Sequence, residues 1–428
     1  MSKLKVIIVA DRFCWGSVRA CVDSIDVSKF DIIVANNGSA LIKEDLIPGS
    51  YTEFYDSAAE IPYGKIIQDV LHAVGIDTGI VIVNPCVNCD IMEAIAQLEE
   101  TADSNTDIAM VSVGFNECKQ VVAPRCTIVY IPVYYLDDDL FDKDLITERA
   151  TLLNAALKIM YESTAIIYEI DLNHRFSVNP FIEKNYSESE KERDRRTMKA
   201  YWGMKYFNTE PNLNIVVQVV ATAKKGDKVK ILEVGCDLGV NLLNIKRMIT
   251  MSGTTEVETY GIEVNPQAAG VADNLVDDVR CIDIEDDIPE AFYDRNSFDF
   301  IIFGDVLEHL KDPERVLRLS KCWLKPDGKI VASIPNLMNI SVIEELLKGN
   351  FTYTDRGLLD RTHCHFFTGK EIEKMFTNTG YDLEMVSLKG TVNSVQMELI
   401  KSLIDLGDKS VTEEAYTTFQ YLCIATKK

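Results

Sequence analysis

The sequence predicts an α/β protein built from two domains, each organised around a largely parallel sheet. The chain has 428 residues, which is longer than one ordinary hydrophobic core can organise. Hydrophobic residues make up 47% of it, so both domains can bury a core. In both halves short apolar runs alternate with helical patterns, and this alternation is typical of parallel sheets with crossover helices.

The charge and cysteine content limit the functional class. A formal net charge of -23 argues against nucleic acid or an anionic membrane as the main partner, because phosphate binding needs clustered Lys and Arg. The apolar run at residues 6–10 is too short for a signal peptide, and no stretch approaches the roughly 18 apolar residues of a membrane span. Eleven scattered cysteines indicate reduced thiols. We therefore expect a soluble cytoplasmic enzyme.

The first half opens with alternating strands and helices. The expected elements are strands at 6–10, 31–35 and 80–83 and helices at 17–25 and 64–74. The second strand ends in NNGS, which is turn chemistry, and the third is followed by NPCVNCD.

This half resembles the family 2 glycosyltransferases of the GT-A fold. VIIVADRFCWGSVRACVDSI is similar to their opening strand and helix, DIIVANNGS to their second strand, and IVIVNPCVNCD to the strand carrying their metal-binding acids. AALKIMYESTAIIYEIDLNH resembles the helix and strand that lead to a late histidine, here His174. The resemblance covers about residues 3–208.

The chemistry of that family is missing from this chain. Its sugar-nucleotide site needs carboxylates to hold a divalent cation, but Cys86 stands where the first acid would fall, with Val87 and Asn88 after it. Near the expected catalytic base Glu148 is the sole acid. The acidic run 137–139 is interpreted as a solvated turn, with a displaced metal site as the alternative. We expect residues 1–180 to form a glycosyltransferase-like domain without transfer activity, which recognises a sugar, a nucleotide or a partner.

Four cysteines of this domain are candidate zinc ligands: Cys86, Cys89, Cys118 and Cys126. They include one CxxC, and no second CxxC accompanies it, so ordinary thiols are favoured. Residues 181–210 are expected to form a helical connection that docks one domain on the other, with apolar positions at helical spacing: Met198, Tyr201, Trp202 and Tyr206. A basic acceptor-binding face is the alternative to a solvated one for Arg193, Arg195 and Arg196.

The second half is organised around the segment KILEVGCDLGVN at residues 230–241 and its partner YGIEVNP at 260–266. An apolar run ending in an acid, followed by a glycine turn that opens a helix, presents backbone N–H groups to a nucleotide-like ligand. Glu263, at the end of the next strand, is placed to accept both hydroxyls of a ribose. Asp237 stands where dinucleotide binding uses a second glycine, and its carboxylate would repel a pyrophosphate.

Together with RCIDIED, SFDFIIFGDVLEHL and the helix DPERVLRLSKCWL, these motifs resemble the class I S-adenosylmethionine-dependent methyltransferases over residues 212–428. The resemblance implies a Rossmann-like, seven-stranded domain at 211–428 with S-adenosyl-L-methionine as cofactor. It implies that the methionine part of the cofactor is contacted by Glu233, Gly235, Cys236 and Gly239. The ribose would be contacted by Glu263 and the adenine by Asp283 and Ile284, and Asp305 would lie near the sulfonium. Asp237, in place of the usual glycine, departs from the family pattern.

After a buried strand at 329–334 the chain makes a long excursion containing GLLDRTHCHFFT. This segment resembles the acceptor-facing part of methyltransferases found with surface-glycan enzymes. Histidine is a suitable base near neutral pH, and the candidates are His309, His363 and His365, with Asp360, Arg361 and Asn336 as neighbours. The alternative is that these histidines bond backbone and shape the loop. No metal is expected, since no carboxylate stands at a recognised ligand spacing from them.

The sequence therefore predicts a methyltransferase that modifies oxygen or nitrogen of a sugar, a glycan precursor or a glycan-bearing protein. The first domain would present the acceptor or tether the enzyme to a glycan assembly. Two alternatives stay open: a bifunctional enzyme whose first half still transfers sugar, and a non-catalytic protein that only senses the cofactor. The acceptor and the oligomeric state are not determined by the sequence.

Overall fold

A computed structural model divides the chain into two compact units, Met1–Thr209 and Glu210–Lys428. It describes residues 3–12, 15–41, 43–85, 90–113, 119–121, 124, 128–137, 139–163, 165–170, 186–204, 206–224, 228–253, 256–286, 288–408 and 410–428. The expectations for Cys86, Cys89, Cys118, Cys126 and His174 lie outside these residues. The division falls one residue before the boundary expected from the sequence.

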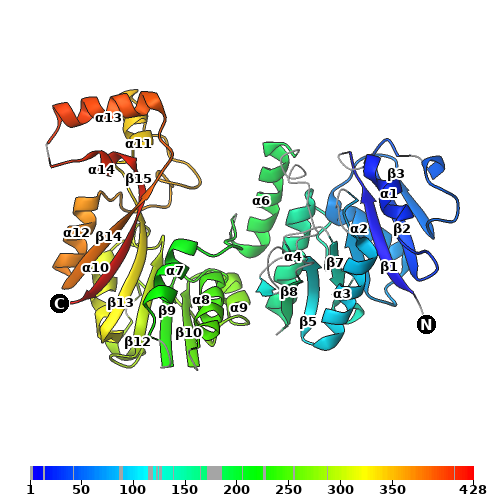
Figure 1. Cartoon of the computed structure of the whole chain (residues 1–428), viewed down its shortest axis with the longest axis horizontal. Coiled ribbons are helices and arrows are strands. Elements are labelled where there is room, and N and C mark those ends of the chain that lie inside the picture. Colours follow the sequence, from blue (N-terminus) through cyan, green and yellow to red (C-terminus); the bar gives the residue numbers. More distant parts are fainter. Residues whose placement is uncertain are drawn as a thin grey trace. The chain divides into compact units, whose positions relative to one another are not determined.

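The described strands of unit 1 form a mixed sheet in the order β3-β2-β1-β4-β7-β5-β8-β6 (Figure 1). Strand β7 is antiparallel to β4 and β5, β6 is antiparallel to β8, and the other pairs are parallel. The bounds are β1 Leu4–Ala10, β2 Phe30–Asn37, β3 Glu53–Ser57, β4 Ile80–Val83, β5 Ile108–Val113, β6 Lys119–Val121, β7 Ile128–Ile131 and β8 Ile166–Ile170.

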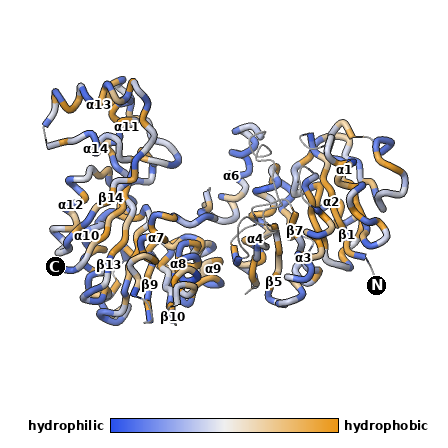
Figure 2. Tube along the Cα trace, viewed as in Figure 1, coloured by the Kyte–Doolittle hydropathy of each residue, from blue (hydrophilic) through white to orange (hydrophobic). Residues whose placement is uncertain are grey.

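Helices pack on this sheet and bury its continuous apolar strands, which stand out in Figure 2. The helices of unit 1 are α1 Val18–Asp23, α2 Tyr63–Val74, α3 Ile91–Ser104, α4 Glu148–Glu162 and α6 Glu188–Trp202, with short 3-10 turns at Trp15–Ser17, Lys43–Asp45 and Val133–Tyr135. Asp137 and Asp139 are exposed, and the Asp137 carboxylate accepts the backbone N–H of Asp139, as expected of a solvated turn.

Helix α6, which lies in the stretch expected as a helical connection at 181–210, falls within unit 1. A capping box of Ser187 and Glu190 starts the helix, and Gly203 ends it with a φ of 73°. Its buried Trp202 donates from Nε1 to Asn154 of α4 at 2.9 Å. Its buried Asp194 accepts two backbone N–H groups just before α4. The apolar spacing was therefore correctly interpreted as a packing face, whose partner is α4.

Unit 2 is a Rossmann-like domain with the described strand order β11-β10-β9-β12-β13-β15-β14. Strand β15 is antiparallel to β13 and β14, and the other neighbours are parallel. The bounds are β9 Lys228–Val234, β10 Glu256–Glu263, β11 Asp278–Cys281, β12 Phe298–Gly304, β13 Leu324–Pro335, β14 Tyr381–Lys389 and β15 Thr418–Lys427. Strands β10 and β12 flank β9 on opposite sides, so the order in which strands are added to the sheet reverses at β9. In parallel sheets, ligands bind at the carboxyl ends of the strands at such a switch point.

The helices of unit 2 are α7 Leu213–Thr222, α8 Val240–Met251, α9 Pro266–Ala272, α10 Pro313–Trp323, α11 Ile340–Leu347, α12 Gly369–Asn378, α13 Ser394–Leu406 and α14 Glu413–Thr417, with a 3-10 turn at Glu290–Phe292. Helices α11, α13 and α14 form a small separate core around Ile340, Ile400 and Tyr416. Among the described residues no helix is both long and apolar enough to cross a membrane.

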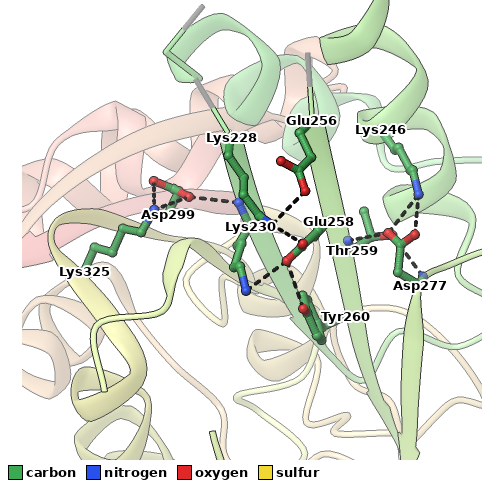
Figure 3. A network of polar contacts seen from close by, with 10 residues as sticks. All are labelled: Lys228, Lys230, Lys246, Glu256, Glu258, Thr259, Tyr260, Asp277, Asp299 and Lys325. Carbon is green, nitrogen blue, oxygen red and sulfur yellow. Dashed lines mark hydrogen bonds and ion pairs between the residues drawn. The ribbon is translucent and has the colours of Figure 1, made fainter. Parts of the chain in front are cut away.

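Charged side chains tie the amino ends of the parallel strands together (Figure 3). Lys228 and Lys230 both pair with Glu258, and hydrogen bonds from these two lysines hold the pKa of Glu258 at about 2. Asp299 accepts from Lys325 and from the backbone of Lys230 at 2.8 Å. These contacts lie at the opposite end of the sheet from the switch point, so the carboxyl ends are left for a ligand.

Candidate functional site

The turn after β9 is closed by its own backbone. The N–H groups of Gly235 and Cys236 both donate to the carbonyl of Ile262 in β10, at 2.8 and 3.1 Å. Gly239 donates to the carbonyl of Cys236 at 2.8 Å and begins α8 with a φ of 78°. The apolar strand, glycine turn and helix expected from KILEVGCDLGVN form as predicted, and the turn lies at the carboxyl end of β9.

Close packing explains the glycines around this turn. A Cβ on Gly235 would lie 2.6 Å from Cγ2 of Val306, and one on Gly261 would lie 2.6 Å from Sγ of Cys236. The Cys236 side chain is buried, and burial raises the pKa of its thiol well above the usual value. Its side chain therefore packs as a neutral thiol inside the turn, which leaves its backbone as the part that could face a cofactor.

Asp237 keeps the left-handed conformation that a glycine would supply, with a φ of 50°. Asp tolerates this region better than most residues. Its backbone N–H donates to Oε2 of Glu263 at 2.9 Å, and Oε1 of Glu263 accepts from the backbone of Asn265 at 2.9 Å. Glu263 thus sits at the end of β10 with its carboxylate between two loops, where ribose hydroxyls could replace or share these contacts.

The end of β11 brings the two residues expected at the adenine to the same edge. The N–H of Ile282 bonds the Glu263 carbonyl at 3.1 Å, so the next residues follow β10 closely. Ile284 is buried, whereas Asp283 is exposed and its carboxylate accepts the N–H of Glu285 at 2.8 Å. An apolar surface beside an exposed carboxylate could hold a flat, polar-edged base.

Glu233 carries a buried carboxylate that is only half satisfied. It is 1% exposed, and Oε1 accepts from Asn241 at 2.7 Å. Oε2 is buried and has no hydrogen-bond partner among the described residues. Burial, together with Asp237 and Glu263 nearby, raises the pKa of Glu233 to about 8, against the hydrogen bond from Asn241. A cation next to Oε2 would satisfy it.

Asp305 follows β12 with a φ of 55°, and its N–H bonds the Oγ of Ser333 at 3.0 Å. The side chain is exposed, yet the dense protein around its carboxyl raises the pKa of Asp305, against hydrogen bonds from Ser333 and Gln420. The next residue is Val306, which touches the Gly235 turn. The loop beginning at Asp305 is therefore in contact with the turn after β9, and its expected place beside the sulfonium stays a prediction.

Two of the candidate histidines meet, and a carboxylate joins them. The rings of His309 and His363 lie 4.7 Å apart between centroids. One ligand-capable atom from each of Glu308, His309 and His363 lies within 4.8 Å of the others. Glu308 is 1% exposed and its Oε2 has no hydrogen-bond partner among the described residues. The fold therefore places a carboxylate beside two of these histidines, although the sequence shows none at a recognised ligand spacing from them.

The remaining predicted residues have structural partners. His365 contacts the Lys311 carbonyl through Nε2 at 3.1 Å and stacks on Phe367, so it shapes the loop. The buried Asn336 donates to the carbonyls of Ala415 and Thr418, both at 2.8 Å. The exposed Arg361 pairs with Asp355, and Asp360 accepts from Thr362.

Glu308 was missed by sequence reasoning. The segment GDVLEHL was interpreted for its first acid and its histidine, and Glu308 lies between them. The fold adds that its backbone carbonyl accepts the N–H groups of Cys364 and His365, at 2.8 and 3.0 Å. This pairing brings residues 363–365 back onto the strand-end loop. The signal available in the sequence was an acid directly before a histidine, just after an apolar strand.

A family model described as a methyltransferase domain matches residues 206–386. The demethylmenaquinone methyltransferase of Oceanobacillus iheyensis is 24% identical over 185 residues, which are 39% of this chain and 75% of that protein. The ubiquinone biosynthesis O-methyltransferase of Chromobacterium violaceum is 23% identical over 167 residues, 38% of this chain and 68% of that protein. Among solved structures, an S-adenosylmethionine-dependent methyltransferase from Archaeoglobus fulgidus has a TM-score of 0.34 and 16% identity, covering 56% of this chain and 94% of its own.

Proposed function

We propose, from the premise that this chain is an S-adenosylmethionine-dependent methyltransferase, that it methylates oxygen or nitrogen of a sugar, a glycan precursor or a glycan-bearing protein. Unit 1, in this proposal, is a glycosyltransferase-like domain that recognises the acceptor or a partner. The observation that carries the proposal is the row of aromatic rings, Phe351, Tyr353 and Phe366, that runs from the surface to His363.

The residues around the β9 turn fit the cofactor. The unpartnered Oε2 of Glu233 suits the cofactor's ammonium group, and the paired oxygens of Glu263 suit two ribose hydroxyls. Gly235 has no side chain, and Val306 of the loop from Asp305 lies next to it. When bound, the cofactor supplies a methyl group activated by a positive sulfur. We propose Glu233, Gly235, Gly239, Glu263, Asp283, Ile284 and Asp305 as its contacts, with Cys236 contributing backbone.

The protein's own part in the reaction is positioning and exclusion of water. Methyl transfer is an in-line displacement, so the acceptor atom has to be held on the far side of the methyl group from sulfur. The loop from Asp305 to His309 touches the cofactor turn, and His363 touches His309. Burial and the nearby His309 lower the pKa of His363, so its ring is neutral near pH 7. These residues hold the acceptor next to the methyl group.

Cofactor binding should strengthen as pH rises toward 8. Free Glu233, with a pKa of about 8, is mostly protonated at neutral pH, and pairing with an ammonium favours the ionised form. Binding therefore releases a proton, and below about pH 8 each pH unit weakens affinity by up to about tenfold. Above about pH 8 the gain ends, and the cofactor's own α-amino group begins to lose its charge.

Calorimetry at several pH values in two buffers of different ionisation enthalpy measures both the affinity and the proton count. We expect nearly one proton released at pH 7 in the wild type and none in Glu233→Gln, whose affinity should be flat with pH. A wild-type protein that binds without proton release would contradict the pairing of Glu233 with the ammonium.

The acceptor proposal rests on the excursion after β13. Phe351 and Tyr353 are 41% and 50% exposed, with ring centroids 5.5 Å apart, and Phe366 lies 5.7 Å from Phe351. The ring of His363 is 5.8 Å from Phe366. The apolar C–H face of a sugar packs well on such rings, while its hydroxyls reach polar neighbours. The row would lead an acceptor from solvent to the methyl group.

A pocket of about 430 Å³ in unit 1 supports a recognition role for this domain. Its lining includes Tyr134, Tyr135, Asp137, Lys158 and Tyr201. Exposed aromatic rings with charged neighbours suit a polar, ring-shaped ligand. Glu148, the acid considered as a catalytic base, is buried and accepts from Asn84 at 2.9 Å. This environment supports the expectation that sugar transfer has been lost.

A labelled-methyl assay tests the acceptor class. The full chain and labelled S-adenosylmethionine are added to an extract of the source cell, and the product is separated into protein, lipid-linked glycan and small-molecule fractions. We expect label in a sugar-containing fraction and loss of it in Phe351→Ala with Tyr353→Ala. Label in a carbohydrate-free small molecule would overturn the glycan proposal.

One specific observation favours a second acceptor class. The two relatives reported above are named for methylation in quinone biosynthesis, and a flat phenolic ring would also stack on the aromatic row. The same assay separates the two classes, because a phenolic product partitions into organic solvent and contains no sugar.

A further inference from the structure

We propose that Glu308, His309 and His363 hold a divalent transition-metal ion that binds the acceptor hydroxyl beside the cofactor. This inference rests on the proposed methyl transfer, because it assigns the acceptor's position and activation. It is drawn from the grouping of the three side chains, from two of their buried atoms that have no hydrogen-bond partner among the described residues, and from hydrogen bonds that orient both rings.

The ligand atoms are already gathered. They lie within 4.8 Å of one another, whereas the ligands of a tetrahedral ion with bonds of about 2.1 Å are about 3.4 Å apart. Small rotations of the side chains would close that difference. Glu308 is almost completely buried, and its Oε2 has no partner among the described residues. A buried carboxylate oxygen in that state is costly unless a cation or proton occupies the site.

Both imidazoles present one nitrogen to the cluster. Nδ1 of His309 lies 3.1 Å from Oγ1 of Thr362, whose hydroxyl donates to Asp360 at 2.7 Å. The hydroxyl hydrogen is thus used, so Nδ1 of His309 carries a proton and Nε2 keeps a lone pair. The His363 ring bonds the backbone of Leu358, and its buried Nδ1 has no partner among the described residues. This is the outer support that metal-binding histidines typically have.

The donor set indicates the kind of ion. Two imidazoles and one carboxylate suit a borderline divalent ion such as zinc or cobalt, whereas magnesium prefers oxygen ligands alone. Asp305 and Asp360 add negative potential at Glu308, which a divalent cation would offset. Three protein ligands leave an open coordination position, and the half-buried His309 and His363 leave it reachable from solvent.

The ion would activate an oxygen acceptor. An acceptor hydroxyl on the open position becomes more acidic and loses its proton to solvent. Its oxygen then forms a bond to the methyl carbon while the carbon–sulfur bond breaks, and the bonding pair returns to sulfur. The products are a methyl ether and neutral S-adenosylhomocysteine. The loop between Asp305 and His309 touches the cofactor turn through Val306, so the two reactants would be neighbours.

Cobalt(II) is the probe, because it reports its ligands by colour. The full chain, treated with chelator and free of cofactor, is titrated with Co²⁺ by calorimetry and visible absorption. We expect one site with the weak bands of nitrogen and oxygen ligands and without the intense near-ultraviolet band of thiolate ligands. Glu308→Gln and His363→Gln should each weaken Co²⁺ binding by at least about tenfold.

His365→Gln is the matched control, since His365 lies two residues away, bonds the Lys311 carbonyl and should leave Co²⁺ binding unchanged. Unchanged S-adenosylmethionine affinity in each variant shows that the fold is intact, and His363→Gln decides the test if Glu308→Gln does not fold. No Co²⁺ binding, a thiolate band alone, or equal binding in His363→Gln would overturn the metal site. A wild type that binds Co²⁺ but no cofactor would instead overturn the proposed function.

Discussion

Replacing Glu263 with alanine should weaken S-adenosylmethionine binding by at least about a hundredfold. Two hydrogen bonds from ribose hydroxyls to a carboxylate are each worth about 1.5–3 kcal/mol. Alanine removes both acceptors and also releases the N–H groups of Asp237 and Asn265, which the carboxylate holds at 2.9 Å in the free protein. Calorimetry with the cofactor measures the loss directly.

Glu256→Ala is the control for this experiment. Glu256 lies at the other end of the same strand β10, where it is exposed and bonds Lys228 at 2.7 Å. Its loss should leave cofactor affinity unchanged. Circular dichroism should show the same fold in both variants, and Glu263→Gln, which keeps one acceptor oxygen, should bind with intermediate affinity. Unaltered affinity in Glu263→Ala would refute the ribose assignment.

Replacing Gly235 with alanine should destabilise the protein by about 2–4 kcal/mol and abolish cofactor binding. Part of the cost is the left-handed backbone, with a φ of 69°, which disfavours any Cβ. The rest is crowding, because the new Cβ would lie 2.6 Å from Cγ2 of Val306 and force the turn and the strand-end loop apart. Denaturant unfolding, followed by a spectroscopic signal from unit 2, measures the loss of stability. Titration with the cofactor measures the loss of binding.

Two further variants separate backbone strain from crowding. Gly349 also has a positive φ, of 84°, but nothing lies within 4 Å of a Cβ built on it, so Gly349→Ala should cost only about 1 kcal/mol. Adding Val306→Ala to Gly235→Ala should recover about 1–2 kcal/mol in a double-mutant cycle. Equal costs at the two glycines would show that contact with Val306 is unimportant.

The sequence alone was informative wherever the signal was local. The apolar run, glycine turn and helix around β9 and α8 were predicted closely, and Glu263 was placed correctly at a strand end. These features depend on residues within about one turn or one strand of each other, so side-chain periodicity and turn chemistry suffice to find them. The expected place of Asp305, at the start of a strand-end loop beside the sulfonium, came from the resemblance to the methyltransferases and stays a prediction.

Long-range packing decided what spacing along the chain does not encode. Helix α6 was expected from its local pattern as a connecting helix, and the structure adds that Trp202 and Asp194 pack it on unit 1. Cys236 was expected at the cofactor, and its side chain is enclosed beside Gly261.

The sequence by itself predicted the α/β architecture and the glycine turn after β9, and its resemblance to the methyltransferases indicated the reaction class. Only the tertiary structure decided which side chains share the acceptor end of the site. Glu308 and His363 are 55 positions apart, and they meet because the backbone of residues 364–365 bonds the Glu308 carbonyl. Such a contact depends on how a long excursion returns to the sheet, and that return is fixed by hydrogen bonds and packing between distant segments, which no local pattern records.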